Sequence, residues 1–219
     1  MSDDKKKSVW TGYSAEERAA VDALARGYID FLSDCKTERE SVQEAVRTAE
    51  AAGYRDLADI IAEGTQLRAG DKDYAVNMKK AIVLFHIGTE PMENGMNILG
   101  AHIDTCRLDV KQNPLYEDGG LAYFDTHYYG GIKKYQWVTM PLALHGVIAK
   151  KDGTVVNVNI GEDPSDPVFF ISDLLIHLAQ DQMQLTAAKL IDGENMDIVF
   201  DTQPLDSESE SAVKANVLK

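Results

Sequence analysis

A histidine and an aspartate two residues apart are the first candidates for chemistry in this chain. His102 and Asp104 come at the end of Met96–His102, an apolar stretch that predicts a buried strand. Side chains alternate along a strand, so both would project to the same side, and strand ends in open α/β sheets are where ligands bind. A histidine can ligate zinc while a carboxylate accepts its other ring N–H. Because the His-x-Asp tripeptide is common, its spacing alone favours a histidine and an aspartate with a structural role, their polar atoms hydrogen-bonded, over a metal site.

The other histidines and the cysteines are weaker candidates. His86 lies in an apolar run and is predicted to be a core residue, and His127 stands beside two tyrosines, which favours a structural role over a pocket lining. Cys35 and Cys106 are far apart and neither forms a Cys-x-x-Cys pair, so we expect free thiols. The sequence places no base beside Cys106, which argues against nucleophilic catalysis.

Composition restricts the classes of partner. The 219 residues are 44% hydrophobic, which is enough for a folded core, and their formal net charge is −14. An acidic surface repels phosphates, so we expect no nucleic-acid partner. There is no apolar run that could span a bilayer, and the polar stretch Met1–Lys7 is unlike a signal peptide. We therefore expect a cytoplasmic protein without a membrane partner.

The elements that must position His102 and Asp104 begin with two helices. Capping boxes at Ser14–Glu17 and Thr37–Glu40 predict helix starts, and the second helix is expected to stop near Gly53. The apolar, β-branched run Ala81–Ile87 then predicts a buried strand, which Met96–His102 would join. Helices followed by buried strands indicate the α/β class.

The second half of the chain is predicted to be mostly β. Three stretches predict strands: Trp137–Met140, Leu142–Ala149 and Thr154–Gly161. Lys151–Thr154 predicts a hairpin turn between the last two. The acidic Ser207–Ser211 predicts a loop or frayed end, and 212–219 resembles the start of a helix.

Four landmarks resemble the aspartyl aminopeptidase and aminopeptidase I family of zinc metallopeptidases. They follow the family order, and together they extend the resemblance to essentially the whole chain, as the N-terminal portion of a bacterial-type member. The first is similar to the family's first metal motif, a glycine–alanine–histidine–x–aspartate strand end. The landmarks are Asn97–Thr105 with Arg107–Lys111, Tyr128–Ile132, Leu142–Ile148 and Ile171–Leu178.

The resemblance implies a role for three side chains. His102 would ligate one zinc of a two-zinc site, and Asp104 would be the catalytic aspartate that orients the site and supports the general base. His177 would match the histidine that an inserted domain delivers to a neighbouring subunit's active site, where it contacts substrate. The implied reaction is removal of N-terminal residues from peptides by metal-activated water.

The implied fold is the first part of a zinc-peptidase (phosphorylase/hydrolase-like) catalytic domain, residues 1–108, followed by an inserted β-rich oligomerisation domain, residues 109–219, that is incomplete. We expect a homo-oligomer, with the apolar stretch Pro167–Ile171 at the interface, although this stretch could equally pack within its own domain. One histidine and one aspartate cannot hold catalytic zinc, which normally takes three protein ligands. The chain is therefore predicted to be inactive without the remaining catalytic half. The rival reading is a non-catalytic oligomerisation or interaction module derived from such a peptidase.

Overall fold

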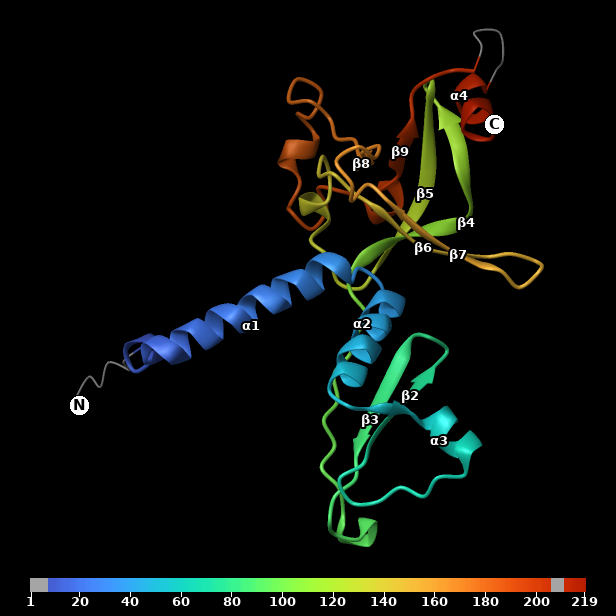
Figure 1. The fold of residues 1–219 in the computed structure, drawn as a ribbon. Coiled ribbons are helices and arrows are strands. Elements are labelled where there is room, and N and C mark those ends of the chain that lie inside the picture. The colour runs from blue at the N-terminus through green and yellow to red at the C-terminus, as the bar shows by residue number, and fades with distance from the viewer. Residues whose placement is uncertain (1–7, 206–210) are drawn as a thin grey trace, which may run out of the picture. The chain divides into compact units, whose positions relative to one another are not determined.

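The computed structural model describes residues 8–205 and 211–219. The chain divides into two compact units, Met1–Asp104 and Thr105–Lys219, here called the N-terminal unit and the C-terminal unit (Figure 1). Both units combine helices with strands, so the chain is of the mixed α/β class. None of the described helices is both long and apolar enough to cross a membrane.

Two helices open the N-terminal unit at the predicted capping boxes. In α1 (Ala15–Asp34) and α2 (Glu38–Ala51), the caps Ser14 and Thr37 accept a backbone N–H and are bonded in return by a glutamate. Gly53, just after α2, has a φ of +86°, a conformation that glycine adopts without strain. α2 buries part of one face, whereas α1 buries none of its residues.

A three-stranded sheet follows the helices in the order β1-β2-β3. β1 (Arg55–Asp56) runs parallel to β2 (Lys72–Asn77), and α3 (Leu57–Glu63) connects them. β2 and β3 (Ala81–His86) form an antiparallel hairpin. The buried hydrophobic side chains of this unit come from the two shorter helices, the α1–α2 junction and β2: Cys35, Val42, Ala49, Ile60 and Tyr74.

The apolar stretches of the N-terminal unit are less buried than the sequence predicts. Ala81–Ile87 does form a strand, β3, but Val83 and Phe85 remain 52% and 42% exposed. The predicted strand Met96–His102 is wrong for this structure, because the segment is irregular and Leu99 is fully exposed. A strand requires a hydrogen-bonded neighbour, and no described strand pairs with this segment.

The C-terminal unit is built on a four-stranded sheet in the order β4-β5-β9-β8. β4 (Arg107–Asp118) and β5 (Leu121–Tyr129) form a long antiparallel hairpin, which the sequence reading missed. The predicted domain boundary after residue 108 falls inside β4. β9 (Ile198–Asp201) pairs with β5, and β8 (Phe170–Ile171) pairs with β9.

A second hairpin and a terminal helix complete the C-terminal unit. β6 (Leu144–Ala149) and β7 (Val155–Ile160) pair antiparallel, as the predicted turn at Lys151–Thr154 requires. The last residues form the predicted helix, α4 (Ala212–Val217). Most of the predicted loop Ser207–Ser211 lies outside the described residues. Short 3-10 turns are η1 Val9–Thr11, η2 Met92–Asn94, η3 Lys134–Gln136, η4 Gln182–Gln184 and η5 Gly193–Asn195.

The core of the C-terminal unit decides two of the sequence predictions. It is formed by Phe169, Ile171, Ile191, Met196 and Ile198. Phe169 and Ile171 are 4% and 2% exposed and pack within their own unit, whereas Val168 and Phe170 of the same stretch Pro167–Ile171 are 63% and 39% exposed. The predicted strand Trp137–Met140 is wrong: these residues continue a 3-10 turn, and Trp137 and Val138 pack against the core from there.

Candidate functional site

His102 and Asp104 contact each other on the surface of the N-terminal unit. The Nδ1 atom of His102 lies 3.2 Å from the Oδ1 atom of Asp104 and 3.1 Å from its backbone oxygen. The two side chains are 86% and 40% exposed. If the ring proton is on Nδ1, Asp104 accepts it and the Nε2 lone pair is directed away from that contact. The pair thus has the relation of a metal-binding histidine and its orienting carboxylate, although it lies on an irregular segment rather than at a strand end.

The described residues do not form a complete zinc site. Across 8–205 and 211–219, no three histidine, cysteine, aspartate or glutamate side chains gather closely enough to hold a metal ion. Zinc sites in proteins take three or four such ligands, commonly including histidine. The chemistry of His102 and Asp104 therefore fits zinc, but the donor set is incomplete within these residues.

Contacts within the C-terminal unit hold Cys106 and the first residue of β4. The Nε atom of Arg107 donates to Asp109 over 2.7 Å, and its guanidinium lies 4.0 Å from the ring centroid of Tyr129. The thiol of Cys106 donates to the carbonyl of Gly131 over 3.4 Å. These contacts bring together the sequence landmarks that follow Asp104 and that begin at Tyr128.

Gly130 shows why this meeting point uses glycine. Its φ is +78°, and a Cβ atom added there would lie 3.1 Å from the sulfur of Cys106. Both the backbone conformation and the close approach of Cys106 therefore disfavour a side chain at this position.

His177 belongs to the C-terminal unit and lies in an irregular segment between β8 and η4. Its own side chain is exposed, and the apolar side chains around it are exposed as well. The exposed fractions are 53% for Leu174, 59% for Leu175, 64% for Ile176 and 67% for Leu178. Asp173 stabilises the segment, because its carboxylate accepts hydrogen bonds from the backbone amide of Leu174 over 2.8 Å and from the side-chain amide of Gln182 over 3.0 Å. We call residues 174–178 the apolar loop.

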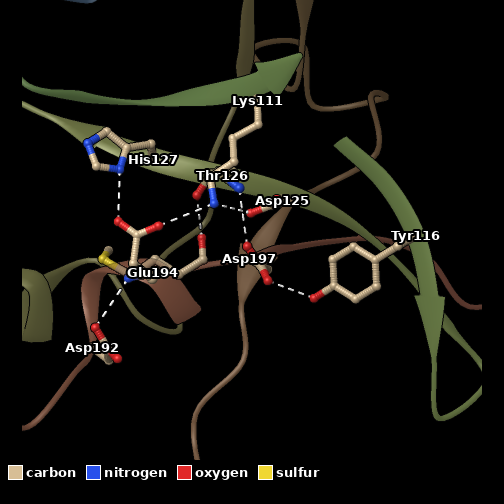
Figure 2. A network of polar contacts seen from close by, with 9 residues as sticks. Lys111, Tyr116, Asp125, Thr126, His127, Asp192, Glu194 and Asp197 are labelled. Atoms are coloured by element: carbon tan, nitrogen blue, oxygen red, sulfur yellow. Dashed lines mark hydrogen bonds and ion pairs between the residues drawn. The ribbon is translucent and has the colours of Figure 1, made fainter. Parts of the chain in front are cut away.

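The apolar loop lies in the segment between β8 and β9, and a polar network holds the end of that segment nearest β9 (Figure 2). Lys111 of β4 reaches Asp125 over 2.7 Å and Glu194 over 3.3 Å, and His127 lies 3.0 Å from Glu194. The hydrogen bond to Asp125, the largest influence, raises the pKa of Lys111. The network keeps η5 against β5, so it holds one end of the segment between β8 and β9.

Asp197 forms the more buried half of the same network. It accepts from the hydroxyl of Tyr116 over 2.7 Å and from the amide of Thr126 over 3.1 Å. Thr126 is fully buried and donates its hydroxyl proton to the carbonyl of Met196 over 2.6 Å. Burial, together with the bond to Asp197, raises the pKa of Tyr116. The sequence does not indicate this network, because its partners are up to 83 residues apart and no spacing rule joins them.

The other histidines differ in environment. His86 is exposed on β3, so its predicted core position is wrong. His127 stacks on Tyr128 with ring centroids 5.1 Å apart, in addition to its contact with Glu194. His145 of β6 has only 8% of its side chain exposed and lies 2.9 Å from Glu162.

Comparison with known sequences decides the family. Residues 31–219 match the family described as Aminopeptidase I zinc metalloprotease (M18). A probable M18 family aminopeptidase 1 of Clostridium acetobutylicum is 55% identical over 214 residues, which cover 97% of this chain and 46% of the relative. The counterpart in Thermotoga maritima is 42% identical over 215 residues, covering 98% and 46%. The chain belongs to the M18 aminopeptidase family.

Solved structures of M18 enzymes share the fold. The Thermotoga maritima M18 aminopeptidase aligns with a TM-score of 0.87 at 42% identity, covering 98% of this chain and 45% of that one. Aminopeptidase I of Clostridium acetobutylicum aligns with a TM-score of 0.82 at 54% identity, covering 96% and 46%. The yeast mApe1 dodecamer shares the fold at 18% identity, with a TM-score of 0.59, covering 89% and 42%. This M18 chain thus spans about half the length of the curated relatives it matches.

Proposed function

We propose that this chain supplies the first part of the active site of a zinc-dependent aminopeptidase, which removes N-terminal residues from peptides. The observation that carries the proposal is the His102–Asp104 contact of 3.2 Å on an exposed segment of an M18 chain. His102 is the proposed ligand to one of two zinc ions. Asp104 is the proposed catalytic aspartate, which fixes the tautomer and orientation of the imidazole.

The chain alone is proposed to be inactive. Zinc, when bound, lowers the pKa of a water molecule and so provides a nucleophile at neutral pH. His102 can supply one ligand, and the described residues offer no group of three. We propose that the remaining catalytic half of the peptidase brings the other ligands and the general base, and that the resulting enzyme is cytoplasmic.

His177 is the proposed substrate-contacting residue of a homo-oligomer. Because Phe169 and Ile171 are buried in their own unit, the apolar loop 174–178 is a better interface candidate than the stretch Pro167–Ile171. A second copy that covers this loop would remove four large apolar side chains from water and carry His177 with them. The same loop favours the alternative function, a non-catalytic oligomerisation or interaction module, since it needs no metal.

Zinc binding separates the two functions. By isothermal titration, the chain alone is expected to bind zinc weakly, whereas the chain assembled with the remaining catalytic half is expected to bind it tightly. His102→Ala should abolish tight binding at one zinc, and the exposed His86→Ala on the same unit should leave it unchanged. One tight, stoichiometric zinc on the chain alone would refute the incomplete site. Equal binding by both variants in the assembly would remove His102 from the site and leave the non-catalytic module.

A further inference from the structure

Asn94 stands directly before a glycine in the N-terminal unit. Of all the asparagines in the chain, it is the only one that glycine follows, and the others precede methionine, isoleucine, valine or proline. Glycine lacks a Cβ atom, so its backbone nitrogen approaches the preceding side chain with the least steric hindrance. An asparagine before glycine is therefore the one whose side-chain amide the backbone attacks most readily.

The structure leaves this pair open to water. η2 (Met92–Asn94) is a single 3-10 turn that buries none of its residues, and residues 91–101 are exposed throughout. Gly95 follows the turn with a φ of +104°, and a Cβ atom added there would meet nothing within 4 Å. No packed side chain of the described residues therefore encloses the backbone at Gly95.

Two hydrogen bonds hold the groups that would react. The N–H of Gly95 donates to the carbonyl of Met92 over 3.0 Å, and the side-chain amide of Asn94 donates to the carboxylate of Glu90 over 3.3 Å. Both bonds lie at the surface, where water replaces them at small cost, and segments without buried contacts open at low free energy. Opening of the turn turns the Gly95 nitrogen toward the Asn94 side chain.

We propose that Asn94 is a modification site, at which the chain deamidates without an enzyme. Hydroxide takes the proton of the Gly95 N–H, and the nitrogen bonds to Cγ of Asn94. The Cγ–Nδ2 bond breaks, and the released nitrogen takes a proton from water and leaves as ammonia, which restores the hydroxide. Water then opens the resulting cyclic imide at one of its two ring C–N bonds. The sum is asparagine plus water giving ammonia plus aspartate or isoaspartate.

The products change the segment that leads to the proposed zinc ligand. Either product adds one negative charge to a chain whose formal net charge is −14. Isoaspartate also places its side-chain carbon in the main chain, which lengthens the backbone shortly before His102. Residues 95–106 form neither helix nor strand, so the longer backbone breaks no regular element there. The site does not depend on the proposed function.

Asn97 is a matched control within the same segment. It is exposed and outside helix and strand like Gly95, but the β-branched Ile98 follows it and crowds the attacking nitrogen. The test is incubation of the chain at 37 °C, with isoaspartate detected by an isoaspartyl methyltransferase and S-adenosylmethionine and assigned by peptide mapping. Asn94 should deamidate at least about tenfold faster than Asn97. The reaction should release ammonia and should be faster at pH 8 than at pH 6, because hydroxide drives it. Equal rates at the two asparagines, or no product at Asn94, would overturn the proposal.

Two substitutions move the reactivity without changing either asparagine. Gly95→Ala should slow deamidation of Asn94 by at least about tenfold, and Ile98→Gly should speed that of Asn97 by at least about tenfold. Ile98 is 81% exposed, so Ile98→Gly should keep the urea midpoint of the chain. It remains decisive even if the φ of +104° makes Gly95→Ala disrupt the turn. An unchanged rate at Asn97 in Ile98→Gly would show that the following residue does not govern the reaction, contrary to the proposal.

Unfolding tests the contribution of the turn itself. In guanidinium chloride, where η2 is lost, Asn94 should react no more than about tenfold faster than in the folded chain, because an exposed turn opens readily. A larger ratio would show that the hydrogen bonds of the turn protect Asn94 in the folded chain, and the assignment of a modification site would fail.

Discussion

Asp73 offers a direct test of how burial governs the stability of the N-terminal unit. This residue, the second of β2, is 1% exposed, and its Oδ2 atom has no hydrogen-bond partner among the described residues. Burial, helped by the nearby charge of Asp71, raises the pKa of this carboxyl above its ordinary value. The folded state therefore holds the proton more tightly than the unfolded state does.

The sign of the pH dependence follows from this direction. At pH below about 3.9 the carboxyl is protonated in both the folded and the unfolded state, so its raised pKa does not lower the free energy of unfolding. As the pH rises from about 3.9 through the raised pKa, the unfolded state releases the proton before the folded state does, so the free energy of unfolding falls. Above the raised pKa, the folded state buries a charge. Asp73→Asn keeps the shape and removes the charge.

We expect Asp73→Asn to stabilise the N-terminal unit by on the order of 1 kcal/mol at pH 7, because both side chains bury an unpaired polar group but the amide carries no charge, and an unpaired buried charge costs more than an unpaired neutral group. A unit of this size gains about 4–8 °C in Tm for each kcal/mol. The measurement is urea denaturation followed by circular dichroism between pH 4 and pH 8. The gain should shrink toward pH 4.

The exposed Asp22 on α1 provides the control, and Asp22→Asn should change the free energy of unfolding by no more than about 0.5 kcal/mol. If Asp73→Asn destabilises the chain at pH 7, or if its effect grows toward acid pH, burial does not govern this carboxyl and the reasoning fails.

Three further predictions concern single sites. Gly161→Ala should lower the free energy of unfolding by more than about 1 kcal/mol in urea titrations, because φ is +108° and the new Cβ atom would lie 3.0 Å from the backbone of Ala143. As a control, Gly100→Ala should be neutral, because a Cβ atom there meets nothing within 4 Å. Tyr116→Phe should cost about 1–2 kcal/mol, since Asp197 loses a 2.7 Å hydrogen bond; an unchanged urea midpoint would show that water replaces it. Limited thermolysin digestion should cut first within 95–105, which lacks helix and strand, and release two fragments; early cleavage inside β4–β5 instead would contradict the division into units.

The sequence alone determined the features that depend on near neighbours. The caps at Ser14 and Thr37 bond to glutamates three residues away, so both helix starts were readable. The turn at Lys151–Thr154 joins strands that are adjacent in the chain, and the β6–β7 hairpin was predicted for the same reason. The His102–Asp104 contact was also local, and the landmarks around it identified the family before any fold was known.

Only the tertiary structure decided the features that depend on distant partners. Glu194 meets Lys111 across 83 residues, and no periodicity in the sequence joins the two. The hairpin of β4 and β5 was missed because its polar and apolar residues alternate poorly around the irregular pairing between Val110 and Leu115. Met96–His102 shows the opposite failure: its residues favour a strand, but a strand exists only when a neighbour accepts its hydrogen bonds. Propensity is a property of the segment, whereas pairing and burial are properties of whatever lies beside it.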